Sequence, residues 1–219
     1  MLNLIMKDIL IQKKQAVFSL FYILIIIFAF QSMEVGTFAA GVVAFTYMMV
    51  MTSCAYEDKN KADIMLNSLP IKRNYIVYIK YVSVAVFFLV GTLAYVVFTS
   101  ILKVIRFPIE INPLTIEEFI GGVVAVSIVS GIYLPAFFKV GYIKSKVLCL
   151  FLFIGFFFSV SFIANFLKEF LNSDAIVGFT NFIQLQSDGA IALIITAIAI
   201  LFMAVSYFVS VMFYKRREF

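Results

Sequence analysis

Few residues in this chain could do enzymatic chemistry. It contains no His, two Cys (Cys54 and Cys149) and 12 Asp or Glu. Without His, the chain cannot form the usual zinc sites, a Ser-His-Asp triad or a Cys-His dyad. Gly36 and Gly41 have the spacing of the start of a phosphate loop, but Val42 and Val43 follow where Lys and Ser or Thr are needed. The sequence therefore predicts a protein that is not itself an enzyme, with no catalytic, cofactor-binding or metal-binding residues.

The helices that must position the remaining polar residues can be recognised as stretches of sequence without charged residues. Six stretches contain no Asp, Glu, Lys or Arg: 16–33, 35–55, 81–102, 119–138, 147–165 and 190–214. A membrane core about 30 Å thick needs roughly 20 apolar helical residues. With 64% hydrophobic and 13% charged residues, the chain is predicted to be an all-α membrane protein. It would form a single domain, 1–219, of six transmembrane helices.

The basic residues predict how the chain is oriented. For six crossings, most of the 17 Lys and Arg fall in the segments 1–15, 56–80, 139–146 and 215–219. The other side holds only Lys103, Arg106 and Lys168. Because basic residues concentrate in cytoplasmic loops, we expect both termini in the cytoplasm of a bacterial cell and the spans in its plasma membrane. The positive charge then reflects topology and contact with the lipid bilayer, and no nucleic-acid partner is expected. Both Cys lie near the reducing side, so no disulfide is expected.

The N-terminal segment 1–14 is amphipathic. Its apolar residues Leu2, Ile5, Met6 and Ile9 recur at helical spacing. This pattern favours a helix lying on the inner membrane surface. A frayed N-terminal tail is the alternative.

The longest inner segment, 56–80, contains a second short amphipathic pattern. Ala62, Met65, Leu66 and Leu69 occupy positions i, i+3, i+4 and i+7, and Pro70 ends the pattern. Such a helix is too polar to cross a membrane. It could dock into a groove on a cytoplasmic partner or lie on the membrane surface, and composition favours neither.

The same segment carries a family resemblance. Glu57-Asp58-Lys59 leaves the second span, the run 65–73 (Met-Leu-Asn-Ser-Leu-Pro-Ile-Lys-Arg) follows, and Tyr75…Lys80-Tyr81 enters the third span. This arrangement resembles the permease subunits of type-2 ATP-binding-cassette exporters. Over its whole length the chain is most similar to small bacterial permeases that export amphipathic peptides, such as the phenol-soluble modulin exporters.

The resemblance implies a mechanism and a set of contact residues. Residues 57–69 would form a coupling helix that docks on a separate ATPase subunit, and the second inner loop, 142–146, would contact the same subunit more lightly. The implied contact residues are Glu57, Asp58, Lys59, Asp63, Met65, Leu66, Leu69, Tyr142 and Lys144. Two ATPases, which would bind ATP and Mg, would join two permeases, the second being a copy of this chain or a paralogue.

Composition bears on the cargo. With 27 Phe, 11 Tyr and 9 Met and no charge within the spans, a path through the protein would suit hydrophobic or amphipathic molecules, among them cytolytic or antimicrobial peptides. No path residues are predicted. Two alternatives remain open: a membrane scaffold that holds a cytoplasmic protein through segment 56–80, and a six-span vitamin-uptake subunit.

Overall fold

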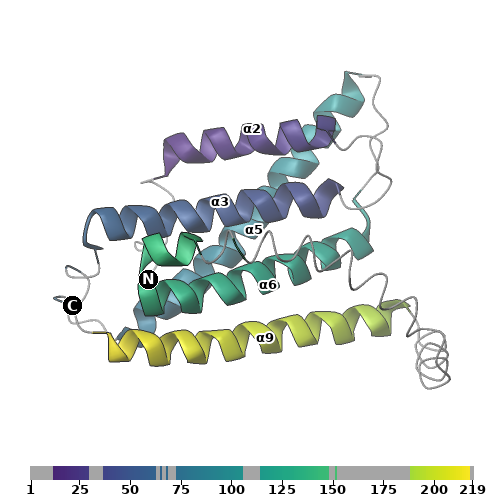
Figure 1. Ribbon diagram of the computed structural model, residues 1–219. Helices are drawn as coiled ribbons and strands as arrows, with labels where there is room; N and C mark the ends of the chain where they lie inside the picture. The colour runs from purple at the N-terminus through teal and green to yellow at the C-terminus, as the bar shows by residue number, and fades with distance from the viewer. Residues whose placement is uncertain are drawn as a thin grey trace.

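The computed structural model describes residues 12–29, 37–62, 65, 68, 73–105, 114–147, 151 and 188–217. Within these residues the chain is 94% helical and has no strand, which confirms the predicted all-α class. The five named helices are α2 (Lys13–Ala29), α3 (Thr37–Lys59), α5 (Arg73–Val104), α6 (Ile116–Val140) and α9 (Asp188–Arg216). Helices α2, α3, α6 and α9 lie roughly alongside one another, and α5 crosses behind them at an angle (Figure 1). A short helix, 142–147, follows α6.

Four of these helices are long and apolar enough to cross a membrane: α3, α5, α6 and residues Gly189–Arg216 of α9. They overlap the predicted spans 35–55, 81–102, 119–138 and 190–214. The segment Gln15–Ala29 of α2 is a shorter apolar helix, within the predicted span 16–33. The predicted span 147–165, apart from residues 147 and 151, lies outside the described residues. So does the predicted surface helix 1–14, apart from residues 12–14.

Long helices reach into the predicted inner segment 56–80 from both ends. Helix α3 continues to Lys59 and α5 already begins at Arg73, so most of the charged residues assigned to a loop lie in the two long helices. The proposed continuous coupling helix 57–69 is also wrong at its start. A turn at Asn60 and Lys61, with a positive φ of 49° at Lys61, follows the end of α3. A positive φ in a residue other than Gly interrupts a right-handed helix.

Helix α3 lies at the centre of the bundle, with α2, α5 and α6 packed around it. Its neighbours approach closely where they carry Gly. A Cβ atom added to Gly91 of α5 would lie 2.8 Å from Phe45 Cδ1, and one added to Gly122 of α6 would lie 2.9 Å from Phe38 Cε1. Both Phe side chains are fully buried. The core therefore consists of aromatic rings on α3 that fit against small residues on α5 and α6.

Helices α6 and α9 run parallel. Ser206 Oγ donates to the carbonyl of Gly131, and seven residues further along α6 the Phe138 ring lies 5.2 Å from that of Tyr214. Two parallel helices require the intervening chain to return to the opposite end of the bundle. A crossing between α6 and α9, as predicted for 147–165, would meet that requirement.

A chain of buried hydroxyl groups joins three helices. Tyr81 Oη of α5 lies 2.6 Å from Ser206 Oγ and 2.8 Å from Ser210 Oγ of α9. Ser206 uses its single proton on the carbonyl oxygen of Gly131 on α6, 2.6 Å away, so Tyr81 donates to Ser206 and Ser210 donates to Tyr81. These hydrogen bonds satisfy the buried hydroxyl groups in a part of the protein where surrounding lipid could not.

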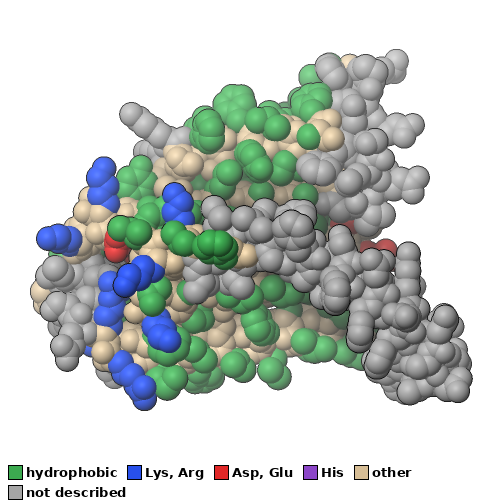
Figure 2. Space-filling view, viewed as in Figure 1, with side chains coloured by type: hydrophobic (Ala, Val, Ile, Leu, Met, Phe, Trp, Pro, Cys, Tyr) green, Lys and Arg blue, Asp and Glu red, His purple; other side chains and the backbone are tan. Residues whose placement is uncertain are grey.

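Charge is distributed as the sequence predicts. Lys and Arg gather at the end of the bundle where α3, α6 and α9 end and α5 begins (Figure 2). We call this the basic end. At the opposite end α6 begins with Glu117 and Glu118 in its first turn, capped by Thr115, whose hydroxyl oxygen accepts from the Glu118 N–H. The sides between the two ends are apolar, and α9 exposes large side chains such as Leu193 and Phe208.

Candidate functional site

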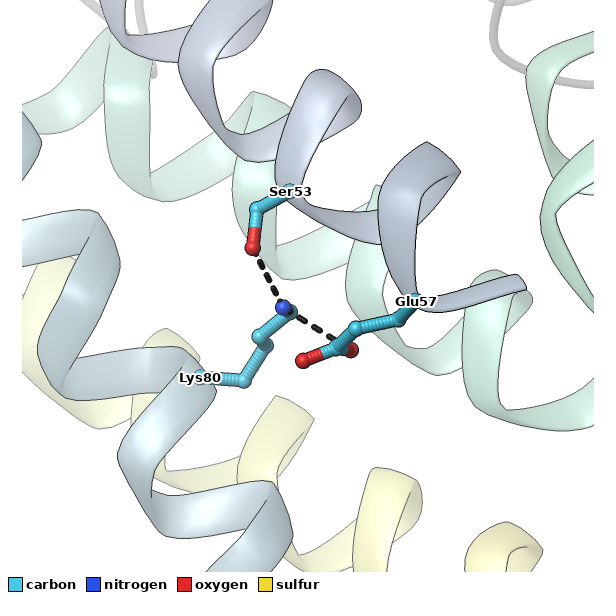
Figure 3. Close-up of polar contacts among 3 residues, drawn as sticks. All are labelled: Ser53, Glu57 and Lys80. Atoms are coloured by element: carbon cyan, nitrogen blue, oxygen red, sulfur yellow. Dashed lines mark hydrogen bonds and ion pairs between the residues drawn. The ribbon is translucent and has the colours of Figure 1, made fainter. Parts of the chain in front are cut away.

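The basic end contains a buried ion pair between α3 and α5. Lys80 Nζ lies 2.9 Å from Glu57 Oε2 and donates to Ser53 Oγ at 2.5 Å (Figure 3). Ser53 and Glu57 are four residues apart, so both face α5 from one side of α3. The side chains of Lys80 and Glu57 are only 5% and 13% exposed. A charge with so little access to water persists only when it is paired and hydrogen-bonded.

The sequence has no charge within the predicted spans, and the structure adds a buried ion pair just outside two of them. The sequence places Lys80 in an inner loop as a topology-setting charge, and it predicts that Glu57 contacts a partner protein. In the structure Glu57 pairs with Lys80. The one signal in the sequence was local: apolar and aromatic residues flank Lys80 on both sides, from Tyr78 to Val82.

A second link joins the start of α5 to the end of α9. Arg73 Nη1 donates to the carbonyl oxygens of Lys215 and Arg217, at 3.1 and 3.4 Å. The last carbonyls of a helix have no partner within it, and they attract a cation through the helix dipole. Arg73, the first residue of α5, therefore caps the C-terminus of α9.

A third convergence point is Gly141, where α6 ends. Its φ of 82° lies in the region that favours Gly, and its N–H donates to the Phe137 carbonyl at 2.9 Å. A Cβ atom at this position would lie 3.5 Å from Arg217 Nη2 and 3.8 Å from Asp58 Oδ1. The ends of α3, α6 and α9 thus meet at this residue.

Helix 142–147 lies beside these ends and contains the predicted contacts Tyr142 and Lys144. Tyr142 is half-buried, whereas Lys144 is exposed. Burial raises the pKa of the Tyr142 hydroxyl, and the nearby Cys54 and Asp58 raise it further. The hydroxyl therefore stays protonated in the physiological range and can donate a hydrogen bond.

The chain between α3 and α5 is described at only a few positions beyond the turn at Lys61. Residues 62, 65 and 68 are helical, and Ser68 Oγ donates to the Met65 carbonyl at 2.7 Å. Met65 is 60% exposed. Asp63, Leu66 and Leu69 lie outside the described residues.

The predicted contact residues therefore divide by surroundings. Glu57 faces α5, and Asp58 faces the end of α6. Lys59, Met65 and Lys144 are exposed at the basic end. Across the described ranges, no three His, Cys, Asp or Glu side chains come together as a metal site would require. The contacts at the basic end therefore hold the ends of several helices together.

A family described as ABC-2 family transporter protein matches residues 3–215. Neither the curated proteins nor the solved structures include a match to this chain.

Proposed function

The chain belongs to the ABC-2 transporter family, and we propose that it couples ATP hydrolysis in a separate ATPase subunit to export of hydrophobic or amphipathic cargo. Membership of this family makes it the transmembrane subunit of an ABC transporter, and its long apolar helices make it a multi-pass membrane protein. The basic end would face the cytoplasm and the ATPase. Two copies of the ATPase would serve two permease subunits, the second being this chain or a paralogue.

The observation that carries the proposal is that the exposed residues Asn60, Lys61, Met65 and Ser68 lie in the chain between two long helices that are bound to each other. The chain from Asn60 to Lys72 leaves α3 and enters α5, and it presents Met65 to solvent. Within two turns of these junctions, Glu57 and Lys80 bind the two helices to each other. A push on this segment by a partner would therefore move α3 and α5 together.

The other contacts at the basic end would spread that movement. Arg73 holds the end of α9, and Gly141 brings the ends of α6 and α9 against α3. A push on the segment between α3 and α5 would thus move four long helices: α3, α5, α6 and α9. ATP binding can drive transport only if the ATPase pair binds nucleotide more tightly in one arrangement of these helices than in the other.

The cargo is proposed from composition and family resemblance. The chain has 27 Phe, 11 Tyr and 9 Met, and the ion pair that the structure adds lies at the basic end. An amphipathic peptide matches such walls better than a sugar or a metal ion does. The family match weighs against a non-transporting scaffold and a vitamin-uptake subunit.

The proposal is tested with the chain co-purified with its ATPase and placed in nanodiscs. We expect amphipathic helical peptides to stimulate ATP hydrolysis. Met65→Asp should weaken ATPase binding and abolish stimulation, because a charge replaces an exposed apolar contact; we expect at least a tenfold loss of affinity, roughly 1.4 kcal/mol. Thr115→Asp is the matched control, since it adds the same carboxylate at the opposite end and keeps a residue that caps helices well.

Each result has a distinct meaning. Loss of ATPase binding in Met65→Asp but not in Thr115→Asp supports docking through the segment between α3 and α5. Hydrolysis that ignores peptides in an intact complex contradicts the peptide cargo. Failure of the wild-type chain to bind any ATPase contradicts the transport function and favours the scaffold.

A further inference from the structure

An open hollow of about 300 Å³ lies at the basic end between α2, α3 and helix 142–147. On the α3 side it is lined by Met48, Met51, Thr52, Ala55, Tyr56 and Lys59. These six positions follow the helical spacing i, i+3, i+4, i+7, i+8 and i+11, so they form one continuous stripe. The face of α3 that carries Ser53 and Glu57 is a different one and packs on α5.

The stripe changes in polarity along the helix. It begins with the thioethers of Met48 and Met51, passes Tyr56, and ends with the exposed ammonium of Lys59. Thr52 adds little polarity, because its hydroxyl donates to the Met48 carbonyl at 2.7 Å. For a helix that crosses a membrane, this order of apolar and then cationic groups matches an anionic phospholipid, acyl chain first and phosphate last.

The opposite wall provides a second cation. Tyr142 and Lys146, four residues apart on helix 142–147, line the same hollow. In the part of the chain that the structure describes, neither Lys59 nor Lys146 makes an ion pair. Of the neighbouring acidic groups that the structure describes, Glu57 pairs with Lys80, and Asp58 lies near Gly141 and the Tyr142 hydroxyl. Lys59, Lys146 and Tyr142 thus contribute two ammonium groups and a hydroxyl to the lining of the hollow, a donor set suited to phosphate.

We propose that this hollow binds one anionic phospholipid from the leaflet at the basic end, with its phosphate between Lys59 and Lys146 and its chain along Met48 and Met51. The inference goes beyond the transport function and requires only that the chain lies in a membrane. The lipid would join α2 and α3 to helix 142–147 and make their packing depend on membrane composition.

The test measures lipid retained by the full chain. Protein from nanodiscs of equal parts phosphatidylcholine and phosphatidylglycerol is delipidated in steps and analysed by native mass spectrometry. We expect one phosphatidylglycerol to be retained in preference to phosphatidylcholine. Each of Lys59→Gln and Lys146→Gln should reduce its affinity about fivefold, and the double variant about thirtyfold.

Two further variants separate this site from general attraction between lysines and the membrane. Met51→Trp leaves every charge in place but fills the apolar part of the hollow, and it should also release the lipid. Lys144→Gln removes a charge from the same short helix at a position that does not line the hollow, and it should retain the lipid. Unchanged thermal unfolding temperatures would show that the variants are folded.

Three outcomes would overturn the inference. Equal loss of lipid in Lys144→Gln and Lys146→Gln would mean general surface attraction. If inorganic phosphate alone displaced the lipid, or if Met51→Trp retained all of the lipid, the acyl chain would not bind along Met48 and Met51. Binding of an amphipathic peptide in the hollow, with no phosphatidylglycerol retained, would mean that the hollow is a cargo site.

Discussion

Replacing one member of the Glu57–Lys80 pair should destabilise the protein more than replacing both. In Glu57→Leu, the Lys80 ammonium would stay in a site where its side chain is 5% exposed, with Ser53 Oγ as its remaining bonded oxygen in Figure 3. Removing one partner of a buried ion pair costs about 3–5 kcal/mol. Lys80→Met should fall at the lower end of that range, because the Glu57 carboxylate is 13% exposed and lies closer to water.

The double variant Glu57→Leu with Lys80→Met should unfold within about 1 kcal/mol of the wild type, since apolar residues of similar volume replace a buried ion pair at little cost. The double-mutant cycle would then give a coupling energy of at least about 5 kcal/mol, because two single losses of about 3 kcal/mol or more would shrink to at most about 1 kcal/mol in the double variant. Unfolding free energies can be measured in mixed micelles of mild detergent and SDS. Because the chain has no Trp, helical circular dichroism is the suitable signal.

A matched control is Lys103→Met, which removes an exposed lysine at the other end of α5 and should change stability by no more than about 0.5 kcal/mol. Single variants at 57 and 80 that behave like this control would refute the reasoning, as would additive losses in the double variant. Either result would mean that water or lipid headgroups solvate the pair, and that it does not bind α3 to α5.

Two further predictions concern the packing of the bundle and the end of α9. Gly91→Ala should destabilise the protein by about 1–3 kcal/mol, because its Cβ would meet the buried Phe45 ring at 2.8 Å. By contrast, Gly121→Ala, where a Cβ meets nothing within 4 Å, should be neutral or stabilising by up to about 1 kcal/mol; equal losses in the same unfolding assay would contradict the close approach. Arg73→Gln should destabilise by about 1–2 kcal/mol and increase amide hydrogen exchange in the last turn of α9, because the carbonyls of Lys215 and Arg217 lose a cationic donor. Unchanged exchange there would show that water caps α9 equally well.

The positions of the long helices could be read from the spacing of charges. A stretch free of charge, as long as the membrane is thick, has few stable alternatives to a helix, and α5, α6 and α9 each contain a predicted span. The ends of the helices were harder to predict from the sequence. Backbone hydrogen bonding continues into charged residues wherever these find partners, so α5 begins eight residues before the predicted span at Tyr81.

The contacts at the basic end could not be inferred from sequence, because each joins residues far apart in the chain. Lys80 is buried only because α3 places Glu57 and Ser53 opposite it. Arg73 becomes a cap only because α9, which begins more than a hundred residues later, ends beside it. Local patterns record which residues are polar, whereas tertiary packing determines which of them lose contact with water.

The parallel packing of α6 and α9 has a consequence for how the protein is made. Helix α6 leaves the ribosome well before α9, so the face of α6 around Gly131 must wait for its partner while the chain is still being synthesised. Until Ser206 and Tyr81 complete the hydroxyl chain, that face has to be covered by lipid or by the insertion machinery. Contacts between elements so distant in sequence form slowly. Quality control by membrane proteases should therefore act mainly on chains whose α9 has not yet docked.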